Sequence, residues 1–288
     1  MAKSALIKSS IAKKYWMALT GLFLCLFLAG HLAGNLQLIF GTSLQFNEYA
    51  LFMTSNPAVK LLSYVTYISI IFHAIDGILL TIQNKKARPI AYAKNNPAKN
   101  SSFSSRNMAV LGTVIMVFIA THMVNFWAKM HFDKNMPIMT KSIETQPGVL
   151  QDFYVGTQTG QYYPVEQVEV GIHTDKHDHE PKQFIIKNRT ELFFSQADVK
   201  TADLYKDLHK LTFGFFKDSK YGLWFTIGYV LAMLALGFHL WHGFASAFQS
   251  LGLNNPKFNA GIKFFGKAFS VIVSVLFAII PLYIHFSK

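Results

Sequence analysis

The chain has 288 residues, of which 51% are hydrophobic and 15% are charged, a composition that is apolar for a soluble enzyme and ordinary for a helical membrane protein. Its single cysteine, Cys25, excludes a disulfide framework and an iron–sulfur cluster ligated by this chain, which leaves histidine as the metal-ligating residue type. The net charge of +12 does not indicate a nucleic-acid partner, because residues 131–220 hold 11 basic and 13 acidic side chains while the basic excess flanks apolar runs.

Five apolar runs approach or exceed the ~20 residues that a helix needs to cross a hydrocarbon core of ~30 Å. The sequence therefore predicts transmembrane helices at 16–40, 57–82, 107–130, 223–248 and 264–284. The first run is longer than the apolar core of a signal peptide, ~7–15 residues, and no A-x-A site ends it, so we expect an uncleaved helix rather than a signal peptide. Asn56 and Pro57 are typical of a helix start, as cap and first residue.

The short loops predict the orientation of these helices. The segment before the first run and the segments 83–106 and 249–263 carry lysine and arginine without acidic residues, whereas 41–56 carries only Glu48. Basic loops stay in the cytoplasm, so the N-terminus is expected inside and the C-terminus outside. The expected organisation is helices 1–3 in residues 1–130, a long external insertion at 131–220, and helices 4–5 in residues 221–288 of an all-α membrane protein. Within the insertion, 161–170 suggests a short hairpin and 202–216 a surface helix.

Each of the first four predicted spans contains a histidine, and ionisable residues inside membranes are functional candidates by default. At ~1.5 Å per residue, His31 and His122 lie roughly 22 Å from the inner face, while His73 and His239 lie roughly 24 Å from the outer face. The four histidines therefore sort into two pairs at two depths. Each pair suits one haem iron ligated from both sides, an arrangement that passes electrons and leaves no position open for oxygen.

Glycines support this interpretation. Gly77 follows His73 by four residues and Gly243 follows His239 by four, so each lies on the face of its histidine and would let a flat macrocycle approach the backbone. His242 is an alternative ligand to His239, because it lies three residues further along the same helix. For any single membrane histidine, the alternative to haem ligation is a hydrogen bond between helices. For the four histidines together, the alternative is a proton or ion path. A proton path usually shows more acidic residues than Asp76, the only one within a predicted span.

The pattern resembles the dihaem cytochrome b membrane subunit of succinate:quinone oxidoreductases, the succinate dehydrogenase and fumarate reductase complexes of respiratory complex II, in the version with one large membrane subunit. The resemblance covers all five spans. It rests on Phe-x-x-x-His31, Phe72-His73-x-x-x-Gly77, Thr121-His122 and Phe238-His239-Leu-Trp-His242-Gly243-Phe, which continues to Gln249-Ser-Leu-Gly-Leu-Asn254. The insertion at 131–220 is a departure, since it is longer than the external loop expected of the family.

The resemblance implies a function in electron transport and the tricarboxylic acid cycle. It implies that His31 and His122 ligate the distal haem, that His73 and His239 ligate the proximal haem, and that the partners are a flavoprotein subunit, an iron–sulfur subunit, membrane lipid and a quinone. The quinone implied is menaquinone and the location a bacterial inner membrane. The chain itself would carry no dicarboxylate site. Glu48 is the candidate for handling quinone protons, with an exposed loop glutamate as the alternative.

Two further groups of side chains have open interpretations. Lys13, Lys14, Lys86 and Arg106 suit haem propionates, although each also serves the positive-inside topology. The run that contains His173, His177 and His179 suits zinc or copper, with a solvated polar loop as the alternative. The competing functions for the whole chain are a histidine-lined proton or ion transporter, the cytochrome b subunit of another quinone-linked dehydrogenase, and a purely structural anchor.

Overall fold

The computed structural model describes residues 9–87, 89–90, 96–170 and 182–287, and they form two compact units. The first, which we name the helical unit, comprises Met1–Ile39, Asn56–His122 and Phe216–Lys288. The second, which we name the mixed unit, comprises Phe40–Ser55 and Met123–Phe215. The helices of the helical unit are α2 (Ser10–Asn35), α3 (Gln37–Phe40, whose last residue belongs to the mixed unit), α5 (Pro57–Lys86), α6 (Pro97–Asn100), α7 (Phe103–Arg106), α8 (Met108–His122), α11 (Gly222–Ser250) and α12 (Pro256–Phe286).

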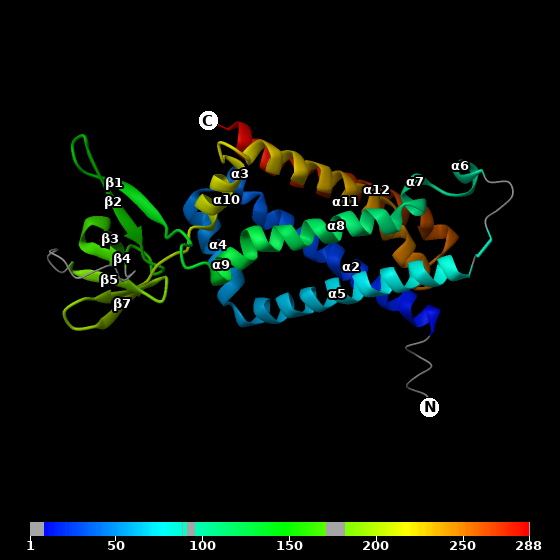
Figure 1. Cartoon of the computed structure of the whole chain (residues 1–288), viewed down its shortest axis with the longest axis horizontal. Helices are drawn as coiled ribbons and strands as arrows, with labels where there is room; N and C mark the ends of the chain where they lie inside the picture. The colour runs from blue at the N-terminus through cyan, green and yellow to red at the C-terminus, as the bar shows by residue number, and fades with distance from the viewer. Residues whose placement is uncertain (1–8, 88, 91–95, 171–181, 288) are drawn as a thin grey trace, which may run out of the picture. The chain divides into compact units, whose positions relative to one another are not determined.

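Five helices in the described part of the chain are long and apolar enough to cross a membrane, as the sequence predicts. They are Ile11–Phe40, Pro57–Lys86, Met108–Phe132, Gly222–Ser250 and Pro256–Phe286. Figure 1 shows α2, α5, α8, α11 and α12 running alongside one another in the helical unit. Large apolar side chains such as Leu26 and Leu61 are exposed on these helices, which suits contact with lipid rather than water.

Local sequence signals set the helix ends. The Asn56 side chain accepts hydrogen bonds from the backbone N–H of Ala58 and Val59, and Pro57 is the first residue of α5, so the predicted start is confirmed. Asn255 and Pro256 start α12 in the same way. The third membrane-crossing helix changes character directly after His122, where Met123–Ala128 forms a π-helix before α9 (Lys129–Phe132). Such π-turns are rare and are frequently found at functional sites.

The prediction of an all-α protein is wrong for the mixed unit, which contains two β-sheets. Strands β1 (Thr140–Gln146), β2 (Val149–Val155) and β3 (Tyr162–Pro164) form an antiparallel sheet. Strands β4 (Val168–Val170), β5 (Phe184–Lys187), β6 (Glu191–Phe194) and β7 (Val199–Asp203) form the other, in which β4 pairs with β5 in parallel. Its remaining regular elements are α4 (Ser43–Ser55), the π-helix Met123–Ala128, α9, the 3-10 turn Val165–Gln167 and α10 (Leu208–Phe216), whose last residue belongs to the helical unit.

Both smaller predictions for this region need correction. Residues 161–170 do not form a hairpin, because β3 pairs with β2 and β4 pairs with β5 in the other sheet. The predicted helix 202–216 begins only at Leu208, since Ala202 is in β7 and packs into a core with Val168, Ile186, Leu192 and Leu204.

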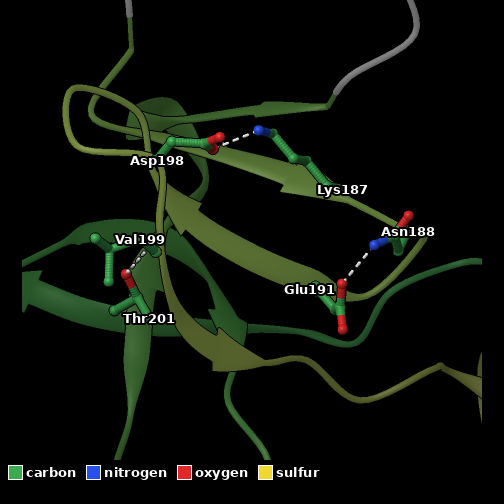
Figure 2. A network of polar contacts seen from close by, with 6 residues as sticks. All are labelled: Lys187, Asn188, Glu191, Asp198, Val199 and Thr201. Atoms are coloured by element: carbon green, nitrogen blue, oxygen red, sulfur yellow. Dashed lines mark hydrogen bonds and ion pairs between the residues drawn. The ribbon is translucent and has the colours of Figure 1, made fainter.

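Charged and amide side chains form polar contacts around β5 and β6 and with the end of α9. Figure 2 shows Lys187 paired with Asp198 and Asn188 bonded to Glu191 on β5–β6 and its turns. Asn188 and Arg189 adopt positive φ values, 48° and 76°, in the turn between these strands. This turn brings the Arg189 guanidinium to the carbonyl oxygens of His131 (2.6 Å) and Met130 (3.0 Å) at the end of α9.

Lys206 donates to the same Met130 carbonyl at 3.0 Å. Cations suit the C-terminal carbonyls of a helix because the helix dipole is negative there. Burial and the neighbouring Arg189 lower the pKa of Lys206 from its ordinary value. Two side chains from the β-sheet region therefore fix the end of the short helix that follows the π-turn.

A buried amide joins α4 to the rest of the mixed unit. The Asn47 side chain is 1% exposed. It donates to Asp207 Oδ1 (2.9 Å) and to Met139 Sδ (3.5 Å), and it accepts from the His209 backbone N–H (3.1 Å). Residues 40–55 therefore belong with 123–215, which explains why the compact unit is larger than the expected insertion at 131–220.

We expect Asn47→Ala to destabilise the mixed unit by about 1–3 kcal/mol, because it leaves the His209 N–H without its partner and leaves the buried Asp207 carboxylate with the Lys210 N–H alone. The measurement is the rate of limited proteolysis of the purified chain in detergent, with sites of cleavage identified by mass. Gln45→Ala is the matched control, since Gln45 is an exposed residue of the same helix. Equal cleavage rates for the two variants would contradict this account of α4.

Candidate haem-binding site

The structure brings His31 of α2 together with His122 of α8, and we name these two residues the outer pair. Their ring centroids lie 5.9 Å apart, with ring planes at 88°. Phe27 stacks on His31 at 5.3 Å, and Phe118 lies 5.6 Å from His122. Each histidine thus has an aromatic ring four residues earlier on its own helix, where side chains share a face.

Other helices complete the surroundings of the outer pair. The ring of Phe277 of α12 lies 5.7 Å from His31, and that of Tyr229 of α11 lies 6.1 Å from His122. The Asn35 side-chain amide donates to the His31 carbonyl at 2.8 Å and lies 3.4 and 3.5 Å from the two ring nitrogens. The outer pair is therefore enclosed by aromatic rings and one amide.

The structure also brings His73 of α5 together with His239 of α11, and we name these two residues the inner pair. Their ring centroids are 6.1 Å apart, with planes at 65°. The Nδ1 atom of His73 lies 3.2 Å from the Met17 carbonyl and 3.3 Å from the Thr20 hydroxyl. A carbonyl only accepts, so Nδ1 carries the proton and Nε2 carries the lone pair. Metal-binding histidines commonly donate their second ring N–H to a carbonyl in this way.

A glycine on a neighbouring helix faces each ring of the inner pair, and the approach is tight at Gly21. A Cβ atom added at Gly21 would lie 3.1 Å from His73 Cε1, and one added at Gly112 would lie 3.8 Å from His239 Cε1. Gly21 is also the residue four positions after Met17, so its missing side chain opens the helix surface beside the carbonyl that His73 reaches. Each of the helices α2 and α8 therefore supplies a histidine to the outer pair and a glycine to the inner pair.

Sequence analysis missed Gly21 and Gly112, although a signal for them exists. Gly21 precedes His31 by ten residues, and Gly112 precedes His122 by the same ten. The predicted glycines behave differently: a Cβ at Gly77 would meet no heavy atom of the described residues within 4 Å, and one at Gly243 would meet only Met108 Cε at 4.0 Å. The predicted packing of Gly77 and Gly243 against a haem stays a prediction.

The remaining candidate residues lie as follows. His242 is half-buried on α11, and it is the ring of His239 that lies against His73. Glu48 is exposed on α4 in the mixed unit, so its quinone role stays a prediction. The run with His173, His177 and His179 lies outside the described residues.

The geometry of both pairs fits a metal ligated by two imidazoles. A metal–imidazole bond of ~2 Å on each side, plus about 1 Å from each nitrogen to its ring centroid, places two such rings on the order of 6 Å apart. The observed separations of 5.9 and 6.1 Å agree with this estimate. Among the described residues, no group of three or more His, Cys, Asp or Glu is arranged to hold a metal ion. A bis-histidine haem needs two protein ligands, and each pair supplies two imidazoles.

We expect Gly21→Ala to destabilise the helical unit by about 1–3 kcal/mol, because the new methyl group overpacks the contact between α2 and the His73 ring. Gly30→Ala is the control: a Cβ there would meet no heavy atom of the described residues within 4 Å, and alanine favours a helix over glycine by ~0.5–1 kcal/mol. The measurement is the thermal unfolding midpoint of each variant in the same detergent. A Gly21→Ala midpoint at or above that of Gly30→Ala would contradict the close approach of His73.

Comparison with known protein families, with characterised proteins and with solved structures finds no match for this chain. Its function is therefore inferred from the two histidine pairs and their surroundings.

Proposed function

We propose that this chain is the membrane-anchoring cytochrome b subunit of a succinate:quinone oxidoreductase, which passes electrons from an iron–sulfur subunit through two b haems to a membrane quinone. The single observation that carries the proposal is the pairing of four histidines from four different membrane-crossing helices into two sets. The alternative is that the histidines only form hydrogen bonds between helices. One polar side chain per helix pair is enough for that, and it does not require two imidazoles to face each other in each of two pairs.

The residues that would hold the haems are His31 with His122 and His73 with His239. Bound haem supplies a one-electron carrier, and ligation by two histidines leaves no open iron position for oxygen or substrate. The protein's own contribution is to fix the ligand rings and exclude water from them. The Met17 carbonyl orients His73, while Phe27 and Phe118 cover the faces of the outer pair.

The two pairs lie at different levels along α2. The inner pair meets this helix at Met17–Gly21, and the outer pair meets it at His31, ten residues beyond Gly21. At ~1.5 Å per residue, ten residues correspond to about 15 Å along the helix axis. Two levels supported by the same set of helices suit the transfer of an electron across the bilayer rather than chemistry at one site.

The remaining parts of the proposal follow from the sequence. The basic loops favour a cytoplasmic N-terminus, so the inner pair lies toward the cytoplasm, where a flavoprotein and an iron–sulfur subunit would dock. The membrane proposed is a bacterial inner membrane and the quinone menaquinone, with Glu48 as the candidate for quinone protons. An electron that moves through the membrane couples to the membrane potential at ~2.3 kcal/mol per charge per 100 mV.

The decisive experiment is a reduced-minus-oxidised absorbance spectrum of the purified chain, with a pyridine haemochrome count of haem per chain. We expect two b haems in the wild type and one in each of His31→Ala and His73→Ala, because each variant loses one ligand of one pair. His242→Ala and His285→Ala are matched controls and should keep two. The ring of His239 is the one that lies beside His73, and His285, near the end of α12, has its Nδ1 atom 2.7 Å from the Phe216 carbonyl.

Chains without haem in freshly prepared membranes would overturn the cytochrome proposal, and proton uptake by sealed vesicles would then test the transporter. Two haems together with co-purification of a metal-centred catalytic subunit, instead of a flavoprotein, would identify another quinone-linked dehydrogenase.

A further inference from the structure

Asp76 is the only acidic residue within the five membrane-crossing helices. It lies on α5, three residues after His73, and its side chain is half-buried. A carboxylate in such a segment is costly unless it has a partner or a task. The proposed binding of haem by the four histidines gives Asp76 neither a partner nor a function.

Lys13 of α2 is the partner that the packing of α2 and α5 supplies. These two helices run alongside each other in opposite directions (Figure 1), and they are joined where His73 reaches the Met17 carbonyl. Lys13 lies one turn before Met17 and Asp76 lies one turn after His73, so both lie on the same side of this contact. Lys13 and His73 are the ionisable neighbours close enough to act through space on the Asp76 carboxylate.

The surroundings of Lys13 differ from those of Lys14, the next residue of α2. Lys13 is half-buried, whereas the adjacent Lys14 is exposed and lies about 100° around the helix. A lysine that only sets the topology needs no fixed direction. The half-buried position of Lys13, on the side of the His73–Met17 contact that also carries Asp76, therefore points to a local electrostatic role beside the inner pair.

We propose that Asp76 and Lys13 form a charge couple that sets the reduction potential of the haem held by His73 and His239, with Asp76 lowering the potential and Lys13 raising it. This inference rests on the proposed function. Oxidised haem iron carries one more positive charge than reduced iron, so a nearby carboxylate favours the oxidised form and a nearby ammonium the reduced form. Both effects are stronger between apolar helices than in water, because charge interactions are less screened there.

The couple also gives the two haems different environments. The helices α2 and α8, which carry the outer pair, contain no acidic residue. The neighbours of the outer pair include Phe27, Phe118, Phe277, Tyr229 and Asn35. Changes of charge at residues 13 and 76 should therefore act mainly on one of the two potentials.

The test is an equilibrium redox titration of both haems in membranes that contain the full chain. We expect Asp76→Asn to raise the potential of the inner-pair haem and Lys13→Gln to lower it, each by up to about tenfold in the reduction equilibrium constant, ~59 mV for one electron. The double variant should return toward the wild type. Asp76→Glu, which keeps the charge, and Lys14→Gln, which removes a neighbouring exposed charge, should leave the potential near its wild-type value.

The outcomes separate the two proposals. Membranes without haem would overturn the proposed function. Two haems whose potentials do not move in Asp76→Asn and Lys13→Gln, or move in the same direction in both, would overturn the charge couple and leave the cytochrome function standing. A purely structural ion pair predicts equal loss of haem in both variants without opposite shifts, which would also overturn the couple.

Discussion

An imidazole placed between apolar helices costs free energy unless its nitrogen atoms are bonded, and the arrangement of α2 and α5 meets this constraint at His73. The Nδ1–H group of His73 donates a hydrogen bond to the Met17 carbonyl, which belongs to another helix. A helix carbonyl is usually shielded by the side chain one turn further along, and here that residue is Gly21. The glycine, the carbonyl and the histidine therefore form one contact, and removal of any of them changes the other two.

A related arrangement occurs between α8 and α11, with two differences. A Cβ at Gly112 would lie 3.8 Å from the His239 ring, an ordinary contact, against 3.1 Å from the His73 ring at Gly21. The residue before Gly112 is Leu111, whereas Thr20 precedes Gly21. The Thr20 hydroxyl lies near His73 Nδ1, whereas Leu111 has no polar side-chain atom to place near His239. In the described residues His239 Nδ1 is buried without a protein hydrogen-bond partner. The backbone of α2 thus determines the orientation of one ring of the inner pair, and packing determines that of the other.

Sequence reasoning predicted what depends on local pattern. The membrane-crossing helices follow from hydropathy, the start of α5 from Asn56 and Pro57, and the grouping of histidines from depth along separate helices. It failed where a contact joins distant segments: the strand containing Ala202 exists because it pairs with Leu192, and β4 pairs with β5 across a long sequence separation. Gly21 was missed for the same reason, since its role is defined by a ring that lies 52 positions later in the chain.

The acidic residues are distributed unevenly between the two units. Residues 131–220 carry 13 of the 15 carboxylates, and all of these except Asp218 fall within the mixed unit, which has its own buried cores and its own polar contact at Asn47. Of the other two, Glu48 belongs to the mixed unit and Asp76 to the helical unit, where Asp76 is the only carboxylate within a membrane-crossing helix. The helical unit is therefore strongly basic, and basic charge near a haem would favour its reduced form. Asp76, one turn from His73, is the one carboxylate of the membrane-crossing helices able to oppose this bias, which gives its position beside the inner pair a physical reason.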